Sequence, residues 1–577
     1  MELSASPFLR LPRELRDAIY LEYVLVDGGY VFNPDTEKLR RATGLEGRDG
    51  ISYAIDLSLM YTCHQVSTEM KGVALGANLI TFNTLYRHDL RVRAGRYVGL
   101  VDYLHFTAAA YAALAYSLCS HRVRDRILAK YSWFEPYLNL ATTNHAHHPE
   151  VNRAFQANDL IRGAGTLRTH GSQVRAQSLV REAALFALQV CLELEDVHDT
   201  LQAHWRETEG PELHREIRIK VPDFLGLAAR YTHWFIPSEG DLDMLFATLH
   251  DSRLCFYGHD KDDDCRTLTR RPWFGNNFVG EFKDAKYRFS AAAAAIRFFK
   301  SFPGIHHGMR NLLVHEDRDA VPWSASHGRG LVHFCEENPL LRIERRVDLW
   351  WNVFPETMGR RIEERFAVTH DWLDETNPTL RRKPTTRMIA QWVMEAAELP
   401  QMPPGCFRLT LDGGAPGPAD ACSEIFQHWV QASAAEQIAL GLTKDRGLPM
   451  TGGPRAHKKW SGNREDLRTL LEMYFETGSS GFPRELSKIV AGTSIVQCLN
   501  FSPGVPHDVE EIVQARRGWN MKEWQDEVEG LRCRPASYTV PTHFNPVSPL
   551  PQWIEILMHN LLDYDSARQY AVNEGYL

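Results

Sequence analysis

The residues of this chain that could do chemistry form short clusters of histidine and acidic side chains. The most metal-like cluster runs from His259 to Cys265 and is rich in aspartate. A calcium-binding EF-hand loop needs glycine at its sixth position and glutamate at its twelfth. A loop that starts at Asp260 has Cys265 and Arg271 at those positions. The run therefore predicts a solvated acidic loop.

Two other histidine clusters have zinc-like residue types without zinc-like spacing. His145, His147 and His148 precede a proline, and His306-His307 follows a Pro-Gly turn. A structural zinc site takes four ligands, usually with cysteines at short spacing. No cysteine lies close in sequence to either cluster. Both are typical of polar loops, and the sequence predicts no metal and no cofactor.

A last charged cluster, from His315 to Asp319, follows an expected strand, where α/β proteins often keep function. It lacks the second histidine of a zinc-protease helix. The chain also lacks a nucleophile elbow, a phosphate loop and a complete dinucleotide fingerprint. We therefore expect no catalytic residue. An enzyme of unrecognised type, with its site between His315 and Arg318, is an alternative.

Composition indicates an ordinary folded protein. Of the 577 residues, 44% are hydrophobic and 24% are charged, and the net charge of −8 disfavours a general nucleic-acid-binding surface. The ten cysteines form no Cys-x-x-Cys pair, which fits reduced thiols. Neither a leader nor an apolar run long enough for a membrane span is evident. We expect an intracellular protein, cytoplasmic or nuclear, without a membrane partner.

The segment that positions the most informative residues is the N-terminal one. Pro12 suits the first turn of a helix, because its missing N–H would have no partner there. Leu15 and Ile19 are four residues apart and share a helix face. The pattern predicts a helix over 12–24.

A second helix is expected over 57–73, from apolar residues at spacings of three and four, and a short strand over 79–82. The segment 27–56 between the two helices holds glycines, a proline and charges. It indicates an exposed insertion.

These two helices carry a resemblance to a known family. The run from Leu11 to Tyr20 resembles the first helix of an F-box, and the run from Leu59 to Val66, with Thr62-Cys63 in it, resembles the second half. Together, over about residues 7–83, they are similar to the F-box-like N-termini of many filamentous-fungal proteins of unassigned function. An F-box is a small helical module that docks on the adaptor Skp1 of a cullin-type ubiquitin ligase.

The resemblance implies an interaction protein. Leu11, Pro12, Leu15 and Ile19 would be the apolar docking residues for a Skp1-like adaptor, the body would hold an unknown target protein, and ubiquitin transfer would belong to the partners. Two alternatives stay open. The helix over 12–24 can simply pack on its own domain, or the insertion at 27–56 can leave a scaffold protein with an F-box-like fold and no ligase role.

The rest of the chain predicts a mixed α/β (α+β) fold. Helix-then-strand units from 288 to 412 favour neighbouring parallel strands, in an irregular body that is either leucine-rich-repeat-like or mixed α/β and not a true solenoid. We expect three parts: an F-box-like module over 1–83, the α/β body over 84–412 and a mainly helical C-terminal region over 413–577. Expected strands are 98–106, 216–224, 311–315, 341–349 and 406–412. Expected helices are 107–130, 175–200, 289–302, 324–337, 385–398, 421–442, 464–476, 509–529 and 553–572.

Overall fold

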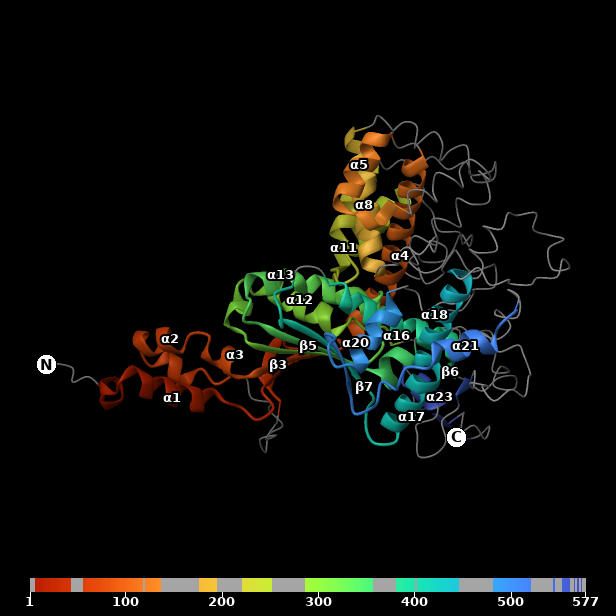
Figure 1. Ribbon diagram of the computed structural model, residues 1–577. Helices are drawn as coiled ribbons and strands as arrows, with labels where there is room; N and C mark the ends of the chain where they lie inside the picture. Colours follow the sequence, from red (N-terminus) through yellow and green to blue (C-terminus); the bar gives the residue numbers. More distant parts are fainter. Residues whose placement is uncertain are drawn as a thin grey trace.

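The structure is a computed structural model of the whole chain (Figure 1). It describes residues 6–42, 55–117, 120–135, 176–194, 221–251, 286–355, 380–399, 402–445, 481–519, 543–544, 553–560, 565, 568–569 and 572.

The centre of the molecule is a seven-stranded sheet in the order β2-β1-β3-β4-β5-β7-β8. Only the β1–β2 pair is antiparallel, and all the other neighbours run parallel. The strands are β1 (Tyr30–Asn33), β2 (Lys38–Arg41), β3 (Leu79–Asn83), β4 (Asn311–Glu316), β5 (Arg342–Asp348), β7 (Phe407–Asp412) and β8 (Val496–Leu499). A separate antiparallel pair joins β6 (Leu380–Arg381) to β9 (His543–Phe544).

The parallel strands join the sheet in chain order, each beyond the last. Because crossovers between parallel strands are right-handed, such an order carries the connecting helices to one face. Helix α12 (Ala291–Ser301) contacts β3 and β4 on that face, and the 3-10 segment η7 (Ser324–Leu331), which α13 (Val332–Glu337) continues, packs against α12. The mixed α/β fold is thereby confirmed.

Alternation along the strands explains which face is covered. On β5, Ile343, Arg345 and Val347 are buried, whereas the side chains between them are half-exposed. Arg345, an arginine among the apolar positions of its strand, therefore lies on the covered face. The opposite face of the sheet is partly open to solvent.

A column of helices stands on the sheet (Figure 1). It contains α4 (His88–Ser117), α5 (His121–Lys130), α8 (Gln177–Leu194), α10 (Val221–Arg230) and α11 (Glu239–Asp251). The predicted strand over 98–106 is wrong, because this run lies inside α4, where Leu100, Val101 and Leu104 are buried at helical spacing. The described part of the expected strand over 216–224 is likewise helical, as the start of α10.

Further helices flank the other end of the sheet. They are α16 (Arg382–Ala397), α17 (Pro418–Ile425), the π-helical η10 (Phe426–Gln431), α18 (Ala432–Asp445), α20 (Phe482–Val490), α21 (Val509–Ala515) and α23 (Trp553–Met558). The expected helix over 464–476 lies outside the described residues. Strand β8 follows α20, so this region also supplies an edge strand of the sheet.

The described part of the segment 27–56, residues 27–42 and 55–56, is not the exposed insertion that its composition indicates. Tyr30 is buried, and β1 pairs in parallel with β3 while β2 closes a hairpin back on β1. The described part of the segment thus extends the central sheet. The sheet also spans the predicted boundaries at 83 and 412, since β3 and β8 are both strands of it.

Candidate functional site: the exposed apolar face of the N-terminal helix

The N-terminal module projects from the sheet edge, away from the helix column (Figure 1). Its elements are η1 (Pro7–Arg10), α1 (Arg13–Val24), η2 (Ser58–Tyr61), α2 (His64–Met70) and α3 (Val73–Ala77). The expected helix over 12–24 is confirmed as α1, and Pro12 is its N-cap residue. The expected helix over 57–73 is divided, because Cys63 caps α2 and Gly72 adopts a left-handed φ of 79°.

One side of α1 is held by the module itself. Tyr20 and Val24 pack with Val66, Met70 and Ala74 in a small core of their own. Phe8 from η1 meets Tyr20 edge to face, with ring centroids 5.6 Å apart. Helix α1 therefore packs on α2 and α3, and it does so through the side that carries Tyr20 and Val24.

A charged network orients the same side of α1. Arg16 Nη2 donates to Glu69 Oε1 at 2.6 Å, and Tyr20 Oη donates to Glu69 Oε2 at 2.7 Å. Arg16 Nη1 also donates to the carbonyl of Leu11 at 2.5 Å, which ties η1 to α1. The bond from Arg16 lowers the pKa of Glu69 far below its usual value, while burial first and then Glu69 raise the pKa of Tyr20 to about 12.

The opposite side of α1 has no cover in the described structure. Leu15 is 52% exposed and Ile19 is 41% exposed, one turn apart. Leu11 is half-buried and Pro12 is exposed at the start of the same helix. Leu15 and Ile19 form what we call the α1 apolar face. Of the four predicted docking residues, Leu15 and Ile19 lie within α1, Pro12 is its N-cap and Leu11 is the C-cap of η1. The structure exposes the two large apolar side chains of α1 side by side.

The module gives a prediction for acid conditions. Because the folded pKa of Glu69 is depressed, its contribution to stability is complete above the ordinary glutamate pKa of about 4.3 and declines as the pH falls below it. We expect Glu69→Gln to lower the hydrogen-exchange protection factors of α1 at pH 7, and the gap from wild type to shrink towards pH 3. Glu14→Gln, an exposed change on α1, is the control. A gap that stays constant with pH would contradict the role assigned to Glu69.

The strand-end cluster from His315 to Asp319 is largely structural. The Glu316 carboxylate is fully buried, accepts from the backbone N–H groups of Ala291 and Ala292, and pairs with Arg345. Asp317 Oδ1 accepts from the Thr84 N–H at 3.0 Å. Burial lowers the pKa of His315. These contacts place the cluster in the framework that joins β4 to α12.

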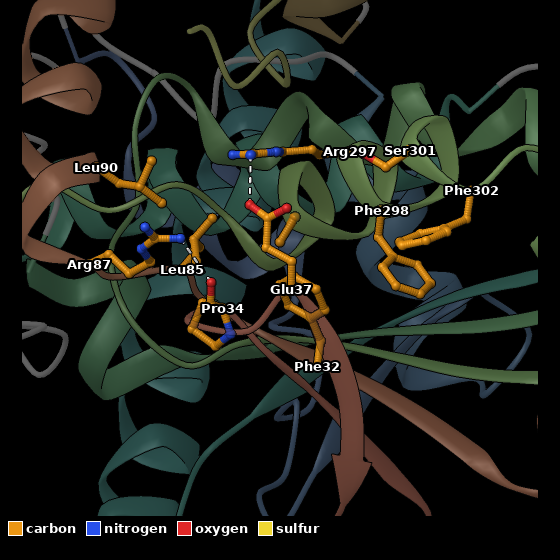
Figure 2. Close-up of a pocket in the computed structure, with 11 residues that line it drawn as sticks. Phe32, Pro34, Glu37, Leu85, Arg87, Leu90, Arg297, Phe298, Ser301 and Phe302 are labelled. Carbon is orange, nitrogen blue, oxygen red and sulfur yellow. Dashed lines mark hydrogen bonds and ion pairs between the residues drawn. The ribbon is translucent and has the colours of Figure 1, made fainter. Parts of the chain in front are cut away.

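A shallow pocket lies between the β1–β2 hairpin and α12 (Figure 2). Its wall is mainly apolar, with Phe32, Phe298 and Phe302 among its lining residues. The ion pair between Glu37 and Arg297, 2.8 Å long, crosses it. None of the residues from His315 to Asp319 lines this pocket, so it adds nothing to an enzyme site there.

Of the histidine clusters, those at 145–148 and 259–265 lie outside the described residues. The expectation of a polar loop is wrong for His306, which is buried at 3% exposure. In the part of the chain that the structure describes, the group that could hold a metal is His306, His307 and Glu337. Sequence reasoning missed it because Glu337 comes from another element and no cysteine marks the site.

No helix among the described residues is both long enough and apolar enough to cross a membrane. Comparison with protein-family models, with curated proteins and with solved structures finds no match to this chain.

Proposed function

We propose that this chain is an F-box-like interaction protein that recognises substrates for a ubiquitin ligase of the Skp1–cullin type. The observation that supports the proposal most is the α1 apolar face. Leu15 and Ile19 are about half-exposed on a helix whose other side is already held by Arg16 and Tyr20. A helix with apolar residues at i and i+4 is a common ligand for a hydrophobic groove.

The packing of α1 favours docking energetically. A helix that is folded before it binds loses less conformational entropy on association than a disordered segment does. The Glu69 network and the small core around Tyr20 keep α1 in place without using Leu15 or Ile19. A partner groove could therefore bury Leu15 and Ile19 while α1 loses little conformational entropy.

The body would present the target-binding surface. On the face of the sheet opposite α12, Glu344 and Arg346 form an ion pair 2.8 Å long, and Arg408 pairs with the same carboxylate. Such a row of partly exposed charges suits recognition of a polar protein surface. No residue of this chain needs to be catalytic, because ubiquitin transfer belongs to the partner proteins.

A second candidate is a scaffold protein that keeps the F-box-like fold without a ligase role. The β1–β2 hairpin favours it, because this hairpin ties the module to the sheet of the body. The two candidates differ in whether a Skp1-like adaptor binds.

The experiment is a calorimetric titration of the full chain with a purified fungal Skp1. Wild type should bind. Completing the burial of Leu15 and Ile19 contributes about 2–3 kcal/mol, so Leu15→Asp/Ile19→Asp should weaken binding about 30- to 150-fold.

The matched control is Leu340→Asp/Ile495→Asp. These side chains are 56% and 42% exposed on the body, which closely matches Leu15 and Ile19. The control should bind like wild type. Absence of wild-type binding would favour the scaffold candidate, and equal binding by both double variants would place the docking surface elsewhere.

A further inference from the structure

The turn that follows α12 brings two consecutive histidines to an acidic side chain from another element. His306 and His307 lie on the 3-10 turn η6 (Ile305–Gly308), and Glu337 is the last residue of α13. One potential ligand atom from each of the three lies within 4.8 Å of the other two. Imidazole nitrogen and carboxylate oxygen are both ligands that zinc accepts.

The distance between His306 and Glu337 is close to that of two ligands of one ion. Two ligands about 2.0–2.1 Å from one tetrahedral zinc lie about 3.3 Å apart. His306 Nε2 is 2.8 Å from Glu337 Oε2, and the rings of His306 and His307 have centroids 4.2 Å apart. Small side-chain shifts would place all three around one ion.

His306 has unmet bonding capacity in this position. Its side chain is almost fully buried. Nε2 lies 2.8 Å from the Glu337 carboxylate, whereas Nδ1 makes no hydrogen bond to any residue that the structure describes. Burying a polar group without a partner costs free energy, about 1–3 kcal/mol in proteins.

The surroundings hold the histidine turn and the carboxylate in place. Asn338 Nδ2 donates to the carbonyls of His306, at 2.7 Å, and Met309, at 3.0 Å, which fixes η6 to the end of α13. Phe334 meets the His306 ring edge to face at 5.1 Å. The second carboxylate oxygen of Glu337 is 3.0 Å from His333 Nε2. Such outer contacts orient ligands in metal sites.

We propose that His306, His307 and Glu337 bind a divalent transition-metal ion of the zinc type. The nitrogen ligands disfavour calcium and magnesium, which prefer all-oxygen sites. Three protein ligands leave a fourth position for water or for a partner's side chain. The bound ion would connect η6 to α13 next to the N-terminal module, since Gly308 of η6 lies against Gly72.

The test uses the full chain without an affinity tag, in reduced form. Cobalt(II), a coloured substitute for zinc, is titrated in and then displaced by zinc. We expect one ion per chain, with visible absorption typical of nitrogen and oxygen ligands. His307→Ala and Glu337→Gln, which change exposed side chains, should each weaken binding at least about tenfold. Circular dichroism in the presence of a chelator confirms that both variants fold.

The matched control is His428→Ala. His428 forms an exposed pair with Glu424 at the same i, i+4 spacing as His333 and Glu337, but without a buried histidine. It should bind cobalt like wild type. The proposal is overturned if wild type binds no ion, if the two ligand variants bind like wild type, or if the spectrum shows thiolate ligation by the cysteines.

Discussion

Glu316→Gln should destabilise the chain by about 3–5 kcal/mol, because it leaves the buried guanidinium of Arg345 without its counter-charge. The Arg345 Nη2 to Glu316 Oε1 distance is 2.7 Å, and both side chains are almost completely buried. The same carboxylate accepts from Ala291 N at 2.9 Å and so also holds the start of α12 on the sheet. Denaturant unfolding followed by tryptophan fluorescence measures the loss.

The control for Glu316 is Glu37→Gln. Glu37 pairs with Arg297 at a similar distance, 2.8 Å, but both side chains are exposed. Exposed pairs contribute about 0–1 kcal/mol, so this variant should unfold near the wild-type midpoint. If the two variants lost equal stability, the buried pair would not have the role that its position assigns to it.

Glu436→Gln should be comparably damaging in the C-terminal helices. Glu436 lies on α18 between Arg382 of α16, at 2.5 Å, and Arg516 at the end of α21, at 2.7 Å. Burial alone would raise the pKa of Glu436, but the two arginines lower it. Removing the carboxylate charge leaves the largely buried guanidinium groups of Arg382 and Arg516 without a counter-charge. We expect this to lower the free energy of unfolding by about 3–5 kcal/mol.

The pH dependence of this triad follows from the lowered pKa of Glu436. Its contribution is present above a pH of about 4.3 and is lost as the pH falls towards the folded pKa. We therefore expect the difference in unfolding free energy between wild type and Glu436→Gln to decrease in acid. Glu424→Gln, an exposed change on neighbouring α17, should show no such difference. A wild-type-like midpoint for Glu436→Gln at pH 7 would refute this role.

The periodicity of α1 predicts its helix but not its buried side. Leu15 and Ile19 would face inwards if apolar residues alone decided the packing. The structure instead buries Arg16, because Glu69 of α2 supplies a partner more than fifty positions away in the sequence. Contacts at that separation leave no local pattern to read.

Two other predictions were wrong although the local sequence did carry a secondary-structure signal. The apolar run over 98–106 is short, and such runs fit a strand or a buried helix equally well. Tyr30-Val31-Phe32, between glycines and Asn33-Pro34, is a β-type run that composition-based reading of 27–56 passed over. The units from α12 to β7 were predictable because their periodic segments end at clear stops such as Gly304, which has a φ of 80°.

The two candidate sites also differ in how far the sequence could predict them. The shared helix face of Leu15 and Ile19 was predictable because the two residues are four positions apart in a periodic segment. The grouping of His306 and His307 with Glu337 was not, because α12, η6 and α13 must fold on the sheet before the two segments meet. A pair of histidines without a nearby cysteine is not a recognisable motif.

The most direct measurement of the central claim is hydrogen exchange of the full chain with and without a Skp1-like adaptor. The adaptor should slow exchange over η1 and α1, at residues 7–24, and leave α12 and the central strands unchanged. Slower exchange confined to the body, or no change anywhere at saturating adaptor, would contradict docking through the α1 apolar face.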